Sequence, residues 1–335
     1  MIRNVVQSQP VLSIRGVSKR FGEIQANRDI NLCLNAGEVL ALLGENGAGK
    51  TTLMSILFGH YVADSGNIEV NGRPLPPGSP SAAIDAGIGM VHQHFTLADN
   101  LSVLDNVVLG SERLWSPVQR RRQAQERLSA LANRFGLDID PDARVGDLSV
   151  GERQRVELLK VLYRDASILI LDEPTAVLTP QEAEALFQTL TEMVSNGLSI
   201  IFISHKLNEV MTIAQRIAVL RHGAVVGEYD RAETSHTELA TAMVGSEVAS
   251  PSKTQMEAGE PVLALKTVSL RHNNSRLLQA SLTVHKHEVL GIAGVSGNGQ
   301  TALADLVSGL CVPESGELVG LGHPAGDHTP AHMVA

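Results

Sequence analysis

A glycine-rich segment between an apolar strand pattern and a helix pattern is the feature that most constrains this chain. It follows a short, mostly apolar stretch at residues 38–43 and matches G-x-x-x-x-G-K-[ST] at every defined position. The residues of this loop are Gly44, Glu45, Asn46, Gly47, Ala48, Gly49, Lys50 and Thr51. Residues 52–59 continue as a helix pattern that ends at a glycine. A strand, a glycine loop and a helix in this order predict an α/β fold of the P-loop type.

The same loop predicts a binding site for phosphate groups. Glycine allows tight backbone turns, so successive N–H groups can point toward one anion at the start of a helix, where the helix dipole also favours negative charge. Lys50 supplies a positive charge for the β- and γ-phosphates, and the hydroxyl of Thr51 is a ligand for Mg²⁺. Together with the next residue, Thr52, the loop predicts a nucleoside triphosphate and Mg²⁺ as ligands.

Length and charge exclude several other classes of protein. The chain has 335 residues, more than one ordinary domain. Its formal net charge of −9 argues against a protein held on nucleic acid by its overall field. No apolar run approaches the roughly 18 residues that span a bilayer, and the N-terminus lacks an apolar core with a cleavage site. We therefore expect neither a membrane-spanning nor an exported chain.

The chain repeats itself at an offset of 250 residues, as from Gly44 to Gly294. Residues 38–40 recur at 288–290, and several single residues of the loop region recur in the same register. These are Gly44, Gly47, Gly49, Thr51, Leu53, Gly59, Ser65 and Gly66, which return as Gly294, Gly297, Gly299, Thr301, Leu303, Gly309, Ser315 and Gly316. The repeat predicts a first domain at residues 1–248, a polar linker at 249–260, and the N-terminal part of a second, incomplete copy at 261–335.

The second copy differs from the first at the lysine position. It has Gln300 where the first copy has Lys50, so the charge that neutralises phosphate is missing. The second loop is therefore expected to bind nucleotide weakly or to be kept only for its fold, and the sequence leaves both readings open.

A second apolar strand is predicted at residues 167–174, with two carboxylates at its C-terminal edge. A short, continuous apolar run predicts a parallel strand buried on both faces, and ligands bind at the carboxyl ends of such strands. Asp172 is expected to hold Mg²⁺, and Glu173 to orient or deprotonate the attacking water.

Two further predicted strands, at residues 87–93 and 199–205, lead to the same edge of the sheet. His205 ends the second strand and is expected to reach the γ-phosphate or the water beside it. Gln93 ends the first strand and is expected to contact Mg²⁺ and the same water.

Ser149 and Gly151 lie at the start of a predicted helix that continues over residues 153–162. Such a helix start is a second anion-binding surface, but these residues are also typical of an ordinary helix cap.

With all of these residues in order, the chain resembles the ATP-binding cassette (ABC) ATPases. The Walker A, Q-loop, signature, Walker B and switch histidine of that family match residues 44–51, Gln93, 148–152, 168–173 and His205. The resemblance implies a P-loop NTPase fold with a RecA-like mixed sheet core, an antiparallel β subdomain and an α-helical subdomain at about residues 100–160. It also implies that Phe21 stacks on adenine.

Within the family, the chain is similar to ATPase subunits of bacterial importers with two fused cassettes, for nucleosides or ribose-like sugars. The similarity rests on residues 148–155, 173–180 and 294–300. Residues 91–95 and 297–300 favour the nucleoside branch, which is linked to BMP-type lipoproteins, over the ribose branch. The implied partners are transmembrane permease subunits and, indirectly, a substrate-binding lipoprotein or periplasmic protein. The implied location is cytoplasmic, on the inner face of the cell membrane, with no nucleic acid partner.

In this family, two cassettes close face to face, so that the signature of one completes the ATP site of the other. The second copy's signature would fall beyond Ala335, so the second cassette is expected to be truncated. We therefore expect slow hydrolysis unless two chains pair through their first cassettes.

Three alternatives remain open at this stage. The importer could be of the ribose/galactose type, or the tandem cassette could serve translation or DNA repair. The short linker and the absence of heptads argue against the second alternative. The chain could also be an inactive truncated nucleotide-binding fragment, a reading that the presence of Glu173 and His205 disfavours.

Overall fold

The computed structural model describes residues 10–92, 95–111, 120–245, 258–272, 275–294, 298–320 and 323–324. The chain divides into two compact units, residues 1–249 and 250–335, each with a hydrophobic core of its own. Gln93 and residues 249–257 of the expected linker lie outside the described residues.

The first unit is built on a six-stranded sheet. In spatial order, its strands are β10 (Ala224–Asp230), β9 (Arg216–Arg221), β3 (Val39–Leu43), β8 (Ser199–Ser204), β7 (Ile168–Asp172) and β6 (Ile88–Val91). All of its neighbours pair in parallel except β10, which runs antiparallel to β9. The three strands predicted from apolar runs, β6, β7 and β8, therefore lie side by side, and their carboxyl ends meet at one edge.

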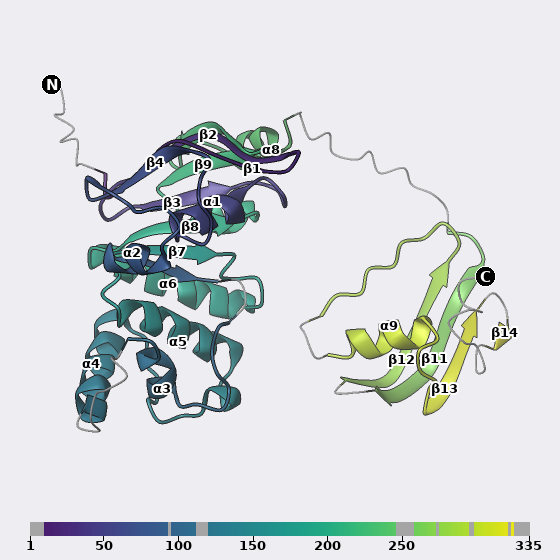
Figure 1. The fold of residues 1–335 in the computed structure, drawn as a ribbon. Coiled ribbons are helices and arrows are strands. Elements are labelled where there is room, and N and C mark those ends of the chain that lie inside the picture. Colours follow the sequence, from purple (N-terminus) through teal and green to yellow (C-terminus); the bar gives the residue numbers. More distant parts are fainter. Residues whose placement is uncertain are drawn as a thin grey trace. The chain divides into compact units, whose positions relative to one another are not determined.

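The central strands send alternate side chains into two cores, as expected for strands buried on both faces. Leu40 and Leu42 of β3 pack on the side of helix α1 (Lys50–Leu57), whereas Ala41 and Leu43 face the opposite side. Helices α5 (Val150–Leu162) and α6 (Pro180–Ser195) cover that opposite side, as Figure 1 shows.

A separate antiparallel sheet lies over the α1 side of the unit (Figure 1). Its strands, in spatial order, are β2 (Ile24–Leu34), β1 (Leu12–Phe21), β4 (Ser65–Val70) and β5 (Arg73–Pro74). The remaining helical elements of the unit are α2 (Pro80–Asp85), α3 (Val103–Val108), α4 (Arg120–Phe135), η1 (Val145–Asp147), α7 (Leu207–Ile213) and α8 (His236–Val244). The predicted α/β fold with an antiparallel β part and a helical part is confirmed.

The second unit contains an antiparallel sheet and one helix among its described residues. The elements are β11 (Pro261–His272), β12 (Ser275–His285), α9 (Gln300–Val307), β13 (Ser315–Gly320) and β14 (His323–Pro324). Helix α9 and strand β13 repeat α1 and β4 at the offset of 250 residues seen in the sequence.

One element of the repeat is not formed as the sequence pattern suggests. Residues 289–293 repeat β3, yet they form no strand, and Val289 and Ile292 are 97% and 52% exposed. In the first unit β3 pairs with β8 and β9, and the described part of the second unit holds no strands in their places. An apolar strand without neighbours loses both its hydrogen bonds and its burial.

Among the residues that the structure describes, no helix is both long and apolar enough to cross a bilayer.

Candidate functional site

The glycine loop connects β3 to α1 as the motif predicts. Gly47 and Gly49 have φ angles of 81° and 101°, a region that favours glycine, and Gly49 is the N-cap of α1. A Cβ on Gly44 would lie 2.3 Å from the backbone oxygen of Leu220, so this position requires glycine for space. The loop therefore packs closely against β9, and its last glycine caps the N-terminus of α1.

Lys50, the first residue of α1, folds back over the loop. Its side-chain nitrogen donates to the carbonyl oxygens of Gly44 at 2.7 Å and Glu45 at 2.9 Å, and the residue is only 6% exposed. Burial lowers the pKa of Lys50, while the charges of Glu173 and Asp172 act in the opposite direction. The lysine thus places a positive charge beside the loop and near two carboxylates.

Thr51 and Asp172 come together from α1 and the end of β7. The threonine hydroxyl makes a hydrogen bond to the carboxylate of Asp172, which is 8% exposed. Burial is the main cause that raises the pKa of Asp172, and the neighbouring charge of Glu173 adds to it, whereas Lys50 lowers it. The two predicted Mg²⁺ ligands are therefore direct neighbours.

This donor set fits a magnesium ion held together with phosphates. Mg²⁺ takes hard oxygen ligands and is usually bound by one or two carboxylates plus the phosphates of a substrate. A hydroxyl and a carboxylate are such ligands, and no group of three His, Cys, Asp or Glu side chains that could hold a metal alone occurs in the described part of the chain.

Glu173 and His205 form a second pair at the same edge. Oε1 of Glu173 lies 2.8 Å from Nδ1 of His205, and the backbone N–H of Glu173 donates to the carbonyl of Ile203 at 3.0 Å. Glu173 has a φ of 47°, a conformation that costs about 1–2 kcal/mol for a residue with a side chain. A glutamate in a strained conformation, in contact with a histidine, is typical of functional sites.

These residues line one open cleft with a volume of about 750 Å³. The lining residues are Phe21, Ile24, Gln25, Ala26, Asn46, Gly47, Gly49, Lys50, Thr51, Thr52, Asp172, Glu173, His222 and Gly223. Gly44, Glu45 and Ala48 belong to the loop but do not line this cleft. His205 does not line it either, but it contacts Glu173, which does. The ring of Phe21, 41% exposed, lines the cleft and makes a T-shaped contact with the ring of Tyr61.

Sequence reasoning missed the turn between β9 and β10 as part of the cleft. His222 and Gly223 line it, and the N–H of Gly223 donates to the carbonyl of Ala48 in the loop at 3.1 Å. No motif in the sequence marks this turn.

Ser149 and Gly151 lie at the N-terminus of α5 and line a different cavity, of about 360 Å³. The hydroxyl of Ser149 accepts from the N–H of Glu152 at 3.3 Å, and the carboxylate of Glu152 accepts from the N–H of Ser149 at 2.8 Å, which is a capping box. The N–H of Gly151 makes a hydrogen bond to Glu182. Within one copy of the unit, the structure therefore does not bring these two residues to the loop of Lys50.

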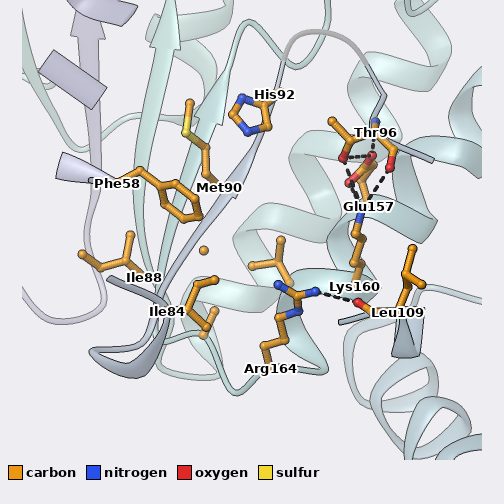
Figure 2. Close-up of a pocket in the computed structure, with 13 residues that line it drawn as sticks. Phe58, Ile84, Ile88, Met90, His92, Thr96, Leu109, Glu157, Lys160 and Arg164 are labelled. Carbon is orange, nitrogen blue, oxygen red and sulfur yellow. Dashed lines mark hydrogen bonds and ion pairs between the residues drawn. The ribbon is translucent and has the colours of Figure 1, made fainter. Parts of the chain in front are cut away.

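A third cavity, of about 310 Å³, lies beside the end of β6 (Figure 2). Apolar side chains such as Phe58, Ile84 and Met90 face charged residues of α5 and the turn after it across this cavity. Lys160 donates to the carbonyl of Thr96 at 3.1 Å, as Figure 2 shows. The cavity thus combines an apolar wall with charged side chains of both signs, Glu157, Lys160 and Arg164, and its lining includes His92 and Thr96.

Comparisons with known proteins show what this chain is similar to. Residues 27–176 match the family model described as "ABC transporter". The chain is 44% identical to the glucose import ATP-binding protein TsgD13 of Haloferax volcanii, over 97% of this chain and 65% of that protein. It is also 44% identical to the guanosine import ATP-binding protein NupO of Bacillus subtilis, over 97% of this chain and 64% of that protein.

A solved structure agrees with the fold of the first unit. The structure of cbiO1 from Clostridium perfringens, part of the ABC transporter complex cbiONQ, superposes with a TM-score of 0.62 at 27% identity, covering 71% of this chain and 95% of cbiO1. The chain spans less than two thirds of the length of the two import proteins that it matches. The comparisons therefore describe a mixed α/β ATP-binding cassette with import-type relatives.

Proposed function

We propose that this chain, whose residues 27–176 match the ABC transporter family model, carries an ATP-binding cassette of that family. In this proposal it binds and hydrolyses ATP and thereby energises a membrane importer for nucleosides or sugars. One observation carries the proposal: Lys50, the Thr51–Asp172 pair and Glu173, which contacts His205, line a single cleft. Each group has a distinct role in transferring a phosphoryl group to water.

Transfer of a phosphoryl group to water depends on positioning and on the neutralisation of charge. Lys50 places its charge beside the β- and γ-phosphates when it exchanges the carbonyls of Gly44 and Glu45 for phosphate oxygens. Thr51 and Asp172 would hold Mg²⁺, which would supply further positive charge to the phosphates. The expected contribution of Gln93 to the metal remains part of this proposal.

Glu173 is the group that orients or deprotonates the attacking water. Its contact with His205 at 2.8 Å fixes the direction of the carboxylate, and the histidine is placed to meet the γ-phosphate. Phe21, which lines the cleft, offers its ring to the adenine base.

The separation of the two cavities supports a site that is completed by a second cassette. Ser149 and Gly151 present the start of α5 away from the Lys50 loop of their own unit, so they are available to the ATP of another cassette, in the same or another chain. The start of a helix is a favourable place for the γ-phosphate. In the second unit, Gln300 is the first residue of α9, whereas Lys50 is the first residue of α1. We therefore propose that the loop of the second unit contributes little to hydrolysis.

The cavity in Figure 2 is the place that we propose for contact with a permease subunit. Its apolar wall suits an apolar side chain from a cytoplasmic helix of the permease. The chain would then act on the inner face of the membrane. The transported substrate is proposed only as a class, nucleoside or sugar, with a substrate-binding lipoprotein or periplasmic protein as an indirect partner.

Turnover of ATP by the wild type and by Glu173→Gln tests the proposal. We expect turnover to fall about 10²- to 10⁴-fold in the variant, with Mg·ATP affinity retained. Equal turnover would contradict the catalytic role and favour an inactive nucleotide-binding piece. If DNA or ribosomes stimulate ATP turnover and permease-containing vesicles do not, the result would favour the repair or translation alternatives.

A further inference from the structure

A buried asparagine makes a hydrogen bond to the backbone of the phosphate loop. Asn27, in the middle of β2, is 0% exposed, and its Nδ2 donates to the carbonyl oxygen of Gly49 at 3.1 Å. The amide nitrogen must face this oxygen, because the opposite orientation would place two acceptors together. The side-chain oxygen of Asn27 has no hydrogen-bond partner among the described residues. A half-satisfied buried amide costs stability, so a purely structural role accounts for it poorly.

The carbonyl that Asn27 holds belongs to the peptide unit that joins the loop to α1. The same oxygen accepts the first hydrogen bond of the helix, from the N–H of Leu53 at 3.0 Å. The described residues contain no cis peptide bond, and in a planar trans peptide the C=O and N–H groups point in opposite directions. Fixing the carbonyl of Gly49 therefore also fixes the N–H of Lys50, which points out of the helix start toward the site of the phosphates.

The second unit shows the same junction without the amide. Gly299 matches Gly49, with φ angles of 96° and 101°, and the N–H of Leu303 donates to its carbonyl at 2.9 Å. Leu277 matches Asn27 at the offset of 250, and its Cδ1 lies 3.5 Å from the position of a Cβ on Gly299. A leucine at this place is thus compatible with the same backbone. The amide is present in the copy that has Lys50 and absent in the copy that has Gln300.

We infer that Asn27 is a positioning residue for the phosphate loop: its amide orients the Gly49–Lys50 peptide so that the N–H of Lys50 binds the phosphates of a nucleotide. This inference rests on the proposed function. It predicts that Asn27 contributes to nucleotide affinity and not to the stability of the unliganded chain.

The test compares Asn27→Leu, which copies the second unit, with the wild-type full chain. Dissociation constants for Mg·ATP and Mg·ADP come from calorimetry, and unfolding midpoints are measured without nucleotide. Loss of one net hydrogen bond predicts about 2- to 13-fold weaker binding of both nucleotides. The midpoint without nucleotide is expected to be unchanged or higher, because the unpartnered oxygen is removed as well.

Asn31→Leu is the matched control in the same strand. Asn31 is exposed, accepts from the N–H of Gly16 and donates to the carbonyl of Asp29, so its replacement removes hydrogen bonds away from the loop. Its nucleotide affinity is expected to equal that of the wild type. If Asn27→Leu fails to fold, Asn27→Ala takes its place with the same expected loss.

The outcomes separate this inference from the proposed function. Wild-type affinity in the Asn27 variant, or a lower unfolding midpoint without nucleotide that accompanies the loss of affinity, would overturn the positioning role. Failure of the wild type itself to bind Mg·ATP would instead overturn the proposed function. In turnover assays, KM for ATP should rise with the dissociation constant while kcat changes less, since Glu173 and His205 are not disturbed.

Discussion

Replacement of three loop glycines by alanine separates the two physical reasons for glycine in the phosphate loop. Gly44 lacks a positive φ, but its Cβ would lie 2.3 Å from the backbone oxygen of Leu220. Gly47 has a φ of 81° with no atom within 4 Å of a Cβ. Gly49 combines both features, with a φ of 101° and a Cβ position 2.3 Å from the oxygen of Ala26. The three variants therefore isolate steric overlap, backbone strain, and the two together.

The magnitudes follow from these distances and angles. A left-handed conformation costs about 1–2 kcal/mol for alanine, and the reduced entropy of the unfolded chain returns about 0.4–1 kcal/mol, so Gly47→Ala is expected to cost about 1 kcal/mol. Overlap with a backbone oxygen fixed in a strand costs about 1–3 kcal/mol, which applies to Gly44→Ala. Gly49→Ala is expected to lose about 2–4 kcal/mol.

Hydrogen exchange read by mass spectrometry measures these losses within the first unit alone. Peptides that cover the buried strands β3 and β8 report its opening free energy without interference from the second unit. The expected order of destabilisation is Gly49→Ala, then Gly44→Ala, then Gly47→Ala. Equal losses in all three variants, or the largest loss at Gly47, would refute the reasoning.

Two further predictions concern the metal and the proton. Thr51→Val removes the hydroxyl that contacts Asp172. In calorimetry, the gain in ATP affinity on adding Mg²⁺ should therefore shrink about tenfold or more, while the ATP affinity measured with EDTA stays the same. An unchanged gain would contradict a metal site at this pair. Because the pKa of Asp172 is raised on folding, mainly by burial, its contribution to stability is present below the unfolded-state pKa of about 3.9 and is lost as the pH rises through the folded-state value. As the pH rises from about 4, the unfolding midpoint of Asp172→Asn should therefore fall less than that of the wild type. Parallel pH profiles of the two midpoints would contradict this.

The parts of the site that follow from local sequence were predictable. The motif fixes the order of strand, loop and helix, and the structure forms β3, the loop and α1 in that order, with α1 beginning at Lys50. Apolar runs also predicted β7 and β8, because strands buried on both faces are apolar throughout. Asp172 and Glu173 therefore lie at the edge where the sequence placed them.

Features that depend on long-range packing could not be predicted. The direct contact between Glu173 and His205 depends on how β7 and β8 pair, and the separation of Ser149 from Lys50 depends on the position of α5. Asn27 lies outside every motif, because its role comes from the packing of β2 behind the loop. Residues 289–293 correspond to β3 at the offset of 250 residues but form no strand, because a strand forms only where neighbours can pair with it.

Calorimetric titration of the full chain with Mg·ATP, with Lys50→Ala beside the wild type, tests the central claim most directly. The wild type should bind, and the variant should bind about 10- to 160-fold more weakly, because hydrogen bonds to charged groups contribute about 1.5–3 kcal/mol. No uptake by the wild type, or equal affinity in the two proteins, would contradict a nucleotide site at this loop.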